Sequence, residues 1–350
     1  MAVDLSKIVH RRSISFEELR GKAIAIDAYN MIYQFLSIIR QPDGTPLTDQ
    51  HGNVTSHLSG ILYRTTDMLD MGIQPIYVFD GLPSVLKQKT NAARSKRREE
   101  AYAAWQEAKE SGNVEAMRAH AMASTRIDKR IVESSKELLS LMGIGFINAP
   151  GEGEAQASWM ADRGLVYAAA SQDYDTLMFG ARRVARNLSF SGRRKLPGKN
   201  VYVNVEPEIV DLDETLRGEG ISREQLIWIG LLLGTDFNDG IKGIGPKTAM
   251  KIVKASKSIE DVERAATEKN GSGFSSDVRE VFDLFMNPEV RKMGHEEVEK
   301  LFGMHYDTDG IIRFMCKEHG FSEDRIAKVV ERIGKSKASS RQKGMGAWLK

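Results

Sequence analysis

The 350-residue chain has 41% hydrophobic and 28% charged residues, which excludes an intrinsically disordered chain. Its 50 basic and 48 acidic residues nearly balance, and the single cysteine, Cys316, excludes an internal disulfide framework and a cysteine-based zinc site. The N-terminus has no apolar signal region and no apolar run approaches membrane-spanning length, so we expect a soluble intracellular protein of two domains or one elaborated domain.

Three predicted strands lead into acidic residues. They are Lys22–Ile26 before Asp27, Gln74–Phe79 before Asp80, and Leu165–Ala170 before Asp173 and Asp175. Helical patterns separate the strands, so we predict a parallel sheet with right-handed crossovers. The carboxyl ends of such strands share one edge, where open α/β sheets build their sites. We therefore expect these four acids to converge, although Asp27 taken alone is equally explained as the N-cap of a helix that runs to about Arg40.

Residues 82–130 interrupt this alternation. After a loop at 41–54, a helix at 56–71 and the second strand, the sequence predicts two helices joined by a turn at residues 111–113. The second helix is predicted to run from Val114 through Val132, and residues 131–142 to complete a helix against the core. The first is rich in lysine and arginine. It is explained either as a solvated face or as a basic gate over an acidic site, which would attract a polyanion.

The stretch from Pro150 to Phe179 adds a second acidic pair, Glu152 and Glu154, flanked by glycines. A further strand is predicted just before it, at 144–147. Each acid alone is explained as a helix cap or a surface residue. The four acids of this stretch, Glu152, Glu154, Asp173 and Asp175, would repel one another when brought together, so they need a cation. Hard oxygen ligands with no nearby Cys or His favour Mg²⁺ or Mn²⁺ over zinc.

Residues 181–205 are typical of a hairpin or a pair of strands with a basic turn. Its lysines and arginines are explained either as DNA contacts or as a solvated sheet edge that resists aggregation.

The next helix, Ile221–Leu233, begins with a capping box of Ser222 and Gln225 and leads to Asp236. A glycine-rich turn follows at 243–249 (GIGPKTA), with Pro246 suited to a helix start. Backbone N–H groups at that helix start are suited to a phosphate, although an ordinary helix–turn–helix connection is the alternative. The turn lacks the G-x-x-x-x-G-K-[ST] pattern, which excludes a nucleotide-binding P-loop.

Residues 257–333 are predicted to be helical, and residues 334–344 to form a flexible, basic tail. Apolar side chains return at the tip of that tail, and we interpret them as a peptide that docks on a partner protein.

Several segments together resemble the archaeal and eukaryotic flap endonuclease family of structure-specific 5′ nucleases. They cover nearly the whole chain: IDAYNMIYQFL, TSHLSGILYRT, PIYVFDG, GEGEAQAS, SQDYDTLMFG, LLGTDF, GIKGIGPKTA and the peptide from Gln342. The resemblance implies an α/β fold with a central, mostly parallel twisted sheet, flanking helices, an inserted helical arch and a C-terminal helical region containing a helix–two-turn–helix element. The implied regions are an N-terminal nuclease region (1–105), the arch and cap (82–130), an intermediate nuclease region (125–255) with the helix–two-turn–helix at about 234–254, a C-terminal helical region (256–333), and a tail (334–350).

The resemblance also implies roles for particular residues. Seven acids match the carboxylates that hold two Mg²⁺ ions, for which Mn²⁺ substitutes: Asp27, Asp80, Glu152, Glu154, Asp173, Asp175 and Asp236. Lys87 and Arg94 match the two arch bases that reach the scissile phosphate. We predict DNA contacts for Tyr33, Arg40, Arg98, Gly243, Gly245, Lys247 and Lys251. Backbone carbonyls match a K⁺ site at Gly240, Ile241 and Ile244, and the terminal peptide matches a sliding-clamp motif at Gln342, Met345, Trp348 and Leu349.

The function implied is cleavage at 5′ flap junctions, with 5′–3′ exonuclease activity, in Okazaki fragment maturation and DNA repair. The partners expected are branched DNA and the sliding clamp, with no membrane, for a monomer that is cytoplasmic in an archaeal-type cell and nuclear in a eukaryotic one. Two departures stand out: Ala2 replaces the family's usual glycine, and Leu349 replaces the second aromatic of the clamp motif. The alternatives are a non-catalytic junction-binding scaffold, a bubble-cutting nuclease, a nicked-junction resolvase and a phosphatase.

Overall fold

The computed structural model describes residues 3–189, 192–195, 202–271, 273–274 and 278–342. The chain divides into two compact units, each assembled from separate stretches of sequence. The first unit comprises residues 1–15, 80–92 and 148–292, and the second comprises residues 16–79, 93–147 and 293–350. Among the described residues, no helix is long and apolar enough to cross a membrane.

The first unit combines four sheet strands, a separate hairpin and a group of helices. Its sheet strands lie in the order β1-β9-β6-β5 and its hairpin is β7-β8. The elements are β1 (Arg11–Ser13), η2 (Val85–Lys87), α6 (Gly153–Asp162), β5 (Ala168–Ala170), α7 (Asp175–Met178), β6 (Arg183–Arg186), β7 (Gly192–Lys195), β8 (Tyr202–Val205), β9 (Glu208–Asp211), α8 (Leu212–Glu219), α9 (Arg223–Leu233), α10 (Pro246–Ala255), α11 (Ile259–Asn270) and α12 (Val278–Met286).

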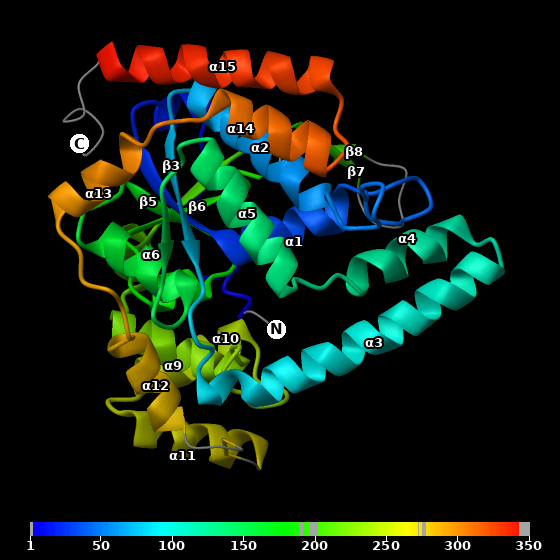
Figure 1. Ribbon diagram of the computed structural model, residues 1–350. Coiled ribbons are helices and arrows are strands. Elements are labelled where there is room, and N and C mark those ends of the chain that lie inside the picture. The colour runs from blue at the N-terminus through cyan, green and yellow to red at the C-terminus, as the bar shows by residue number, and fades with distance from the viewer. Residues whose placement is uncertain (1–2, 190–191, 196–201, 272, 275–277, 343–350) are drawn as a thin grey trace. The chain divides into compact units, whose positions relative to one another are not determined.

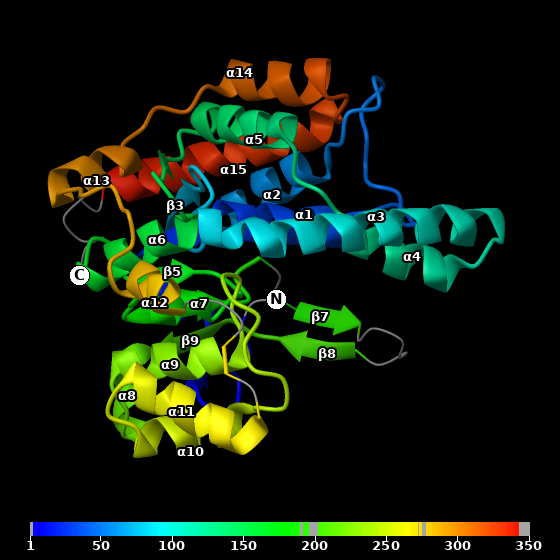
Figure 2. The same cartoon turned by 90° about the horizontal axis from the view of Figure 1, so that it is seen from below.

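The second unit carries strands in the order β2-β3-β4 and most of the long helices. Its elements are η1 (Phe16–Leu19), β2 (Ala23–Asp27), α1 (Ala28–Ile38), α2 (Ser56–Asp70), β3 (Gln74–Phe79), α4 (Val114–Ala123), α5 (Lys129–Leu141), β4 (Phe146–Asn148), α13 (His295–Phe302), α14 (Thr308–Ile312), η3 (Arg313–Glu318) and α15 (Glu323–Gln342). Helix α3 (Gln88–Glu110) begins in the first unit and continues in the second. It forms a helical hairpin with α4 in both views (Figures 1 and 2), as predicted for the arch.

Parallel pairing, predicted from the alternation of strands and helices, is confirmed in both units. In the second, β2 pairs in parallel with β3, and all five residues of β2 are buried. In the first, β5 pairs in parallel with β6, while β9 runs antiparallel to β6 and to β1. Near-continuous apolar runs suit strands covered on both faces.

Several predicted boundaries were wrong. The strand predicted at 165–170 begins only at Ala168, because the Leu165 N–H bonds to the Met160 carbonyl (2.9 Å) and closes the end of α6. The strand predicted at 144–147 lies at 146–148. Of the hairpin predicted at 181–205, β6 joins the larger sheet instead, and only β7 and β8 pair as a hairpin, whose turn lies outside the described residues.

The helix predicted from Val114 through Val132 is interrupted. Helix α4 ends at Ala123 and α5 begins at Lys129. Between them, the Asp128 side chain accepts the Ile131 N–H (2.9 Å), which makes Asp128 the N-cap of a new helix.

The flexible tail predicted from residue 334 was also wrong as far as residue 342, because α15 continues to Gln342. Tertiary contacts hold this extension. The Lys337 ammonium donates to the Gly143 carbonyl (2.5 Å) and to the Met304 carbonyl (3.1 Å), and the Ser336 hydroxyl contacts Asp70 (2.5 Å). The helix therefore packs on its own unit, and α2 is its main neighbour.

One buried side chain joins α6 to a distant segment of the first unit. Gln156 is fully buried, and its Oε1 accepts the Arg291 N–H (2.7 Å) while its Nε2 donates to the Arg291 carbonyl (3.0 Å). The side-chain amide thus pairs with the backbone N–H and carbonyl of one residue, much as a neighbouring strand would. This contact fixes the segment after α12 against the helix that carries Glu154.

Candidate active site

Six of the seven predicted metal-binding acids belong to the first unit. They are Asp80, Glu152, Glu154, Asp173, Asp175 and Asp236. Asp80 and Glu152 form one group around Lys87, while Asp173, Asp175 and Asp236 form another. The Lys87 ammonium also interacts electrostatically with Asp175 and with Glu154, so it lies within electrostatic range of both groups.

Glycines bring Asp80 next to Glu152. The Gly81 N–H donates to the Gly151 carbonyl (2.7 Å), and a side chain on Gly81 would place its Cβ 2.1 Å from the Ala149 carbonyl oxygen. Asp80 Oδ1 then accepts the Gly153 N–H (2.7 Å) at the start of α6. The glycine of the D-G pair therefore permits a backbone approach that no larger residue allows.

Lys87 is the cation of this first group. Its ammonium forms an ion pair and hydrogen bond with Glu152, and the two side chains are 18% and 8% exposed. Burial and, less strongly, the charge of Glu152 together raise the pKa of Asp80 to about 6, against the opposing effect of Lys87. Burial lowers the pKa of Lys87, but Glu152 and Asp80 outweigh burial and leave that pKa above its ordinary value. The lysine is therefore fully charged at neutral pH.

The second group is a set of carboxylates in mutual repulsion. Asp175, the first residue of α7, is 2% exposed, and burial together with the charges of Asp236 and Asp173 raises its pKa to about 7. One compensating contact is the Val3 N–H, which donates to Asp175 Oδ1 (3.3 Å). Such crowding is unfavourable unless positive charge is added.

Ser171 connects these acids and was not predicted from the sequence. Its buried hydroxyl donates to Glu154 Oε1 (2.7 Å) and accepts the Asp173 N–H (3.2 Å). The signal available was a hydroxyl two residues before an acid that follows a strand, which is typical of a local turn.

The donor set fits a divalent cation. Every acid offers carboxylate oxygens, the ligands that Mg²⁺ prefers, and positive charge would relieve the repulsion around Asp175. Throughout the described ranges, no three His, Cys, Asp or Glu side chains converge into a ready-made cage for one ion.

The seventh acid, Asp27, belongs to the second unit. It ends β2 and is the N-cap of α1, because its Oδ1 accepts the Asn30 N–H (3.0 Å). The cap interpretation is therefore confirmed for this oxygen. A cap and a metal ligand are compatible roles, since a carboxylate has several acceptor positions.

The other predicted residues of this unit differ in exposure. Tyr33 is 37% exposed, which argues against a buried core role. Arg40 is half-buried and donates to the Gly44 carbonyl (2.8 Å) and the Thr125 hydroxyl (2.7 Å). Burial lowers the pKa of Arg98, and Tyr33 and Arg94 lie within electrostatic range of it. Tyr33, Arg94 and Arg98 are therefore neighbours.

The glycine-rich turn before α10 has the predicted form. Pro246 is the first residue of α10 and Gly245 is its N-cap, while Gly243, at φ +86°, is in the left-handed region. Lys247 and Lys251 are exposed and lie one helical turn apart.

The residues predicted to hold K⁺ lie in the turns just before. Gly240 has φ +69° and packs against the Gly234 backbone; the Ile241 carbonyl accepts the Ile244 N–H (3.1 Å). Gln342 is the last residue of α15, and the remaining clamp residues, Met345, Trp348 and Leu349, lie outside the described residues.

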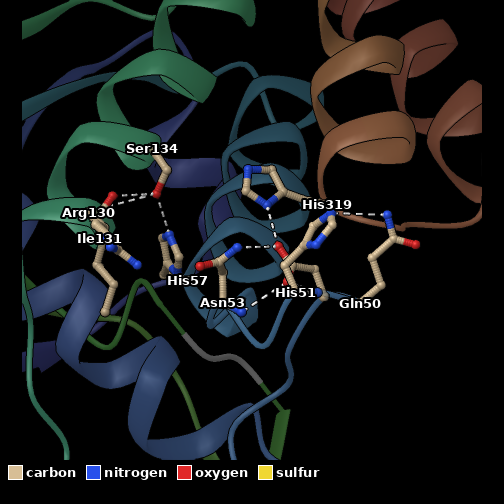
Figure 3. A network of polar contacts seen from close by, with 9 residues as sticks. Gln50, His51, Asn53, His57, Arg130, Ile131, Ser134 and His319 are labelled. Carbon is tan, nitrogen blue, oxygen red and sulfur yellow. Dashed lines mark hydrogen bonds and ion pairs between the residues drawn. The ribbon is translucent and has the colours of Figure 1, made fainter.

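A further polar network in the second unit was not predicted (Figure 3). Asp49 accepts the His51 and Asn53 N–H groups (2.8 and 2.9 Å), and its Oδ2 pairs with His319 Nδ1 (3.3 Å). Nearby, the buried His57 shares a hydrogen bond with the Ser134 hydroxyl (2.8 Å). The network fixes the loop between α1 and α2.

Two family models match the chain. The XPG N-terminal domain matches residues 2–101 and the XPG I-region matches residues 143–236. Flap endonuclease 1 of Pyrococcus furiosus is 47% identical over 351 residues, covering 100% of both chains. That of Sulfolobus acidocaldarius is 46% identical, covering 99% of this chain and 100% of the relative.

Solved structures agree. The flap endonuclease-1 from Methanococcus jannaschii matches with a TM-score of 0.73 and 36% identity, over 96% of this chain and 99% of that one. The catalytic core of Rad2, solved with a DNA substrate, matches in fold with a TM-score of 0.66 and 24% identity, over 95% of this chain and 100% of that one. The predicted α/β fold and the predicted enzyme class are thereby confirmed. The chain belongs to the flap endonuclease family of structure-specific DNA nucleases.

Proposed function

We propose that this nuclease cuts DNA phosphodiesters at 5′ flap junctions, as an endonuclease and a 5′–3′ exonuclease, in Okazaki fragment maturation and DNA repair. The observation that carries the proposal is the crowding of carboxylates around the buried Asp175, next to the Lys87–Glu152 ion pair. A protein that only bound junctions would have no use for such an unfavourable arrangement. The products would carry a 5′ phosphate and a 3′ hydroxyl.

The seven acids would hold two divalent cations, Mg²⁺ or Mn²⁺ in its place. When bound, these cations supply Lewis acidity toward the scissile phosphate. Asp80 and Asp175 are suited to that charge, because their raised pKa values show that the surrounding protein compensates their ionised carboxylates poorly. Asp27, at the end of β2, completes the set in this proposal.

Lys87 and Arg94 would offset the negative charge that develops on the phosphate. Lys87 is paired with Glu152 and is charged at neutral pH. Removing one such electrostatic contact commonly lowers kcat by about 10²- to 10³-fold.

Other contacts would grip the DNA. The exposed Gly243, Gly245, Lys247 and Lys251 would bind duplex phosphates, which makes binding independent of sequence and sensitive to salt. Carbonyls of Gly240, Ile241 and Ile244 would hold a K⁺ ion beside that duplex. Tyr33, which is partly exposed, would stack on an unpaired base, with Arg98 and Arg40 near it.

The partner proposed for the C-terminal peptide is the sliding clamp, bound through Gln342, Met345, Trp348 and Leu349. We further propose a monomer located in the cytoplasm of an archaeal-type cell, or in the nucleus of a eukaryotic one.

The test compares an end-labelled 5′-flap duplex with the matched single strand and the blunt duplex, each with Mg²⁺ and with chelator. Cutting at the flap junction that depends on metal, with little cutting of the other two substrates, supports the proposal. Tight flap binding without cutting in any divalent ion would instead support a junction-binding scaffold.

A further inference from the structure

Arg186 lies beside the loop that carries two of the proposed metal ligands. In the parallel register of β5 and β6, Ala185 is opposite Ala170, the last residue of β5. Arg186 is therefore level with the start of the loop at Ser171. Its side chain is 15% exposed, unlike those of its exposed or half-exposed neighbours Arg182 and Arg183.

The guanidinium of Arg186 contacts this loop at two residues. Its Nη2 donates to the Gln172 carbonyl (3.0 Å), and its Nη1 donates to the Tyr174 hydroxyl. The guanidinium carbon also lies 4.2 Å from the centre of the Tyr174 ring, a cation–π distance. Glu208, its partner across the antiparallel pair with β9, lies 3.9 Å from Nη1 and helps to orient the fork.

These contacts hold the backbone on both sides of Asp173. The peptide that joins Gln172 to Asp173 is held at its carbonyl by Arg186 and at its N–H by the Ser171 hydroxyl. The following residue, Tyr174, is held by the same guanidinium and stands between Asp173 and Asp175. Rotation of the Asp173 backbone would break at least one of these bonds.

We infer that Arg186 is a positioning residue of the reaction, which fixes the loop from Ser171 to Asp175 in the geometry that binds divalent cations. The inference rests on the proposed role of Asp173 and Asp175. Arg186 acts through the loop and does not touch the DNA, because its Nη donors are directed inward to Gln172 and Tyr174. A lysine keeps the charge but cannot reproduce a planar fork with two simultaneous donors.

The test compares Arg186→Lys with a matched control, Arg183→Lys. Arg183 is an arginine of the same strand, but it is 42% exposed and is paired with Asp211 on β9 (3.6 Å). Four quantities are measured for each variant: kcat, KM on the 5′-flap duplex, flap affinity in chelator, and the affinity for Mn²⁺ alone, followed by electron paramagnetic resonance without DNA. Tyr174→Phe, which removes only the hydroxyl that Arg186 contacts, serves as a second variant.

We expect Arg186→Lys to lower kcat by about 10- to 100-fold, since small misplacement of catalytic groups has effects of this order. KM and flap affinity in chelator should stay within about twofold of the wild-type values, and Mn²⁺ affinity should fall. Tyr174→Phe should show a smaller change of the same kind, and Arg183→Lys should show none.

Two results would overturn the inference. A raised KM and weakened flap binding with unchanged kcat would make Arg186 a DNA contact. Lower denaturant stability with wild-type kcat and Mn²⁺ affinity would make it only structural. If the wild-type protein failed to cut flaps at all, the proposed function would fall, and the Mn²⁺ affinities of the two lysine variants would still decide the role of Arg186.

Discussion

Replacing Lys87 with methionine should reveal how much the acidic site depends on its ammonium group. This ammonium is the ion-pair partner of Glu152, and both side chains are largely buried. Removing one partner of such a pair commonly lowers the free energy of unfolding by about 3–5 kcal/mol, because the other charge remains buried without compensation. We expect a loss of this size when unfolding is measured by urea titration in chelator at pH 8.

Added Mg²⁺ should shrink that loss. A divalent cation competes with the ammonium for the same carboxylates, so the variant should bind Mg²⁺ at least about tenfold more tightly, or about 1.4 kcal/mol. At the same time kcat should fall by about 10²- to 10³-fold, because the positive charge that we propose for the scissile phosphate is gone.

Lys136→Met is the matched control for this prediction. The Lys136 ammonium lies 4.7 Å from the centre of the Phe79 ring. Its removal should lower the free energy of unfolding by about 1 kcal/mol or less, equally with and without metal. Lys87→Met would contradict this prediction if its free energy of unfolding fell by the same amount in chelator and in Mg²⁺, or did not fall in chelator.

Three further changes test other parts of the structure. Gly81→Ala should abolish detectable flap cutting in gel assays, because the new Cβ would lie 2.1 Å from a carbonyl oxygen and displace Asp80. The control variant Gly294→Ala has open space around its Cβ and should cut flaps normally. Asp175→Asn should also stop cutting, but in chelator at pH 8 it should unfold at higher denaturant. Because the Asp175 pKa rises from 3.8 to about 7, the ionised carboxylate lowers the free energy of unfolding of the wild type by up to about 4 kcal/mol at pH 8. Burial lowers the pKa of His57 from 6.5 to about 3. As the pH falls below about 6.5, the free energy of unfolding of the wild type should therefore decrease more steeply than that of His57→Gln, by up to about 1.4 kcal/mol per pH unit. Parallel curves of stability against pH for the two proteins would rule this out.

Much of the fold was predictable because local patterns and tertiary packing agree. The strand before Asp27 is a continuous apolar run, and the structure buries every residue of it. The capping box at Ser222 is confirmed, since its hydroxyl accepts the Gln225 N–H while the Gln225 side chain accepts the Ser222 N–H. The start of α5 at Asp128 could have been predicted from the same kind of signal. The extension of α15 could not, because Lys337 binds carbonyls that lie far away in sequence.

The acidic residues of the site could be predicted from the sequence, but the residues that hold them in place could not. The acids follow strands or glycines, which are local signals, and the family resemblance named all seven. Arg186 was included in a basic stretch interpreted as a solvated edge or a DNA contact. Its burial depends on the pairing of β6 with both β5 and β9, which joins residues that no local pattern connects. Ser171 was missed because its partner, Glu154, lies 17 positions away.

The pairing of Gln156 with Arg291 bears on how the first unit opens. Peeling away the segment after α12 would leave a buried amide with neither of its partners, at a cost of about 1–3 kcal/mol for each unsatisfied group. That segment and α6 should therefore unfold together, as one cooperative block. The Arg291 amide would then exchange its hydrogen with solvent as slowly as the amides of α6, although it belongs to no helix or strand. A single slow amide in a loop would thus show how firmly the helix that bears Glu154 is tied to the rest of its unit.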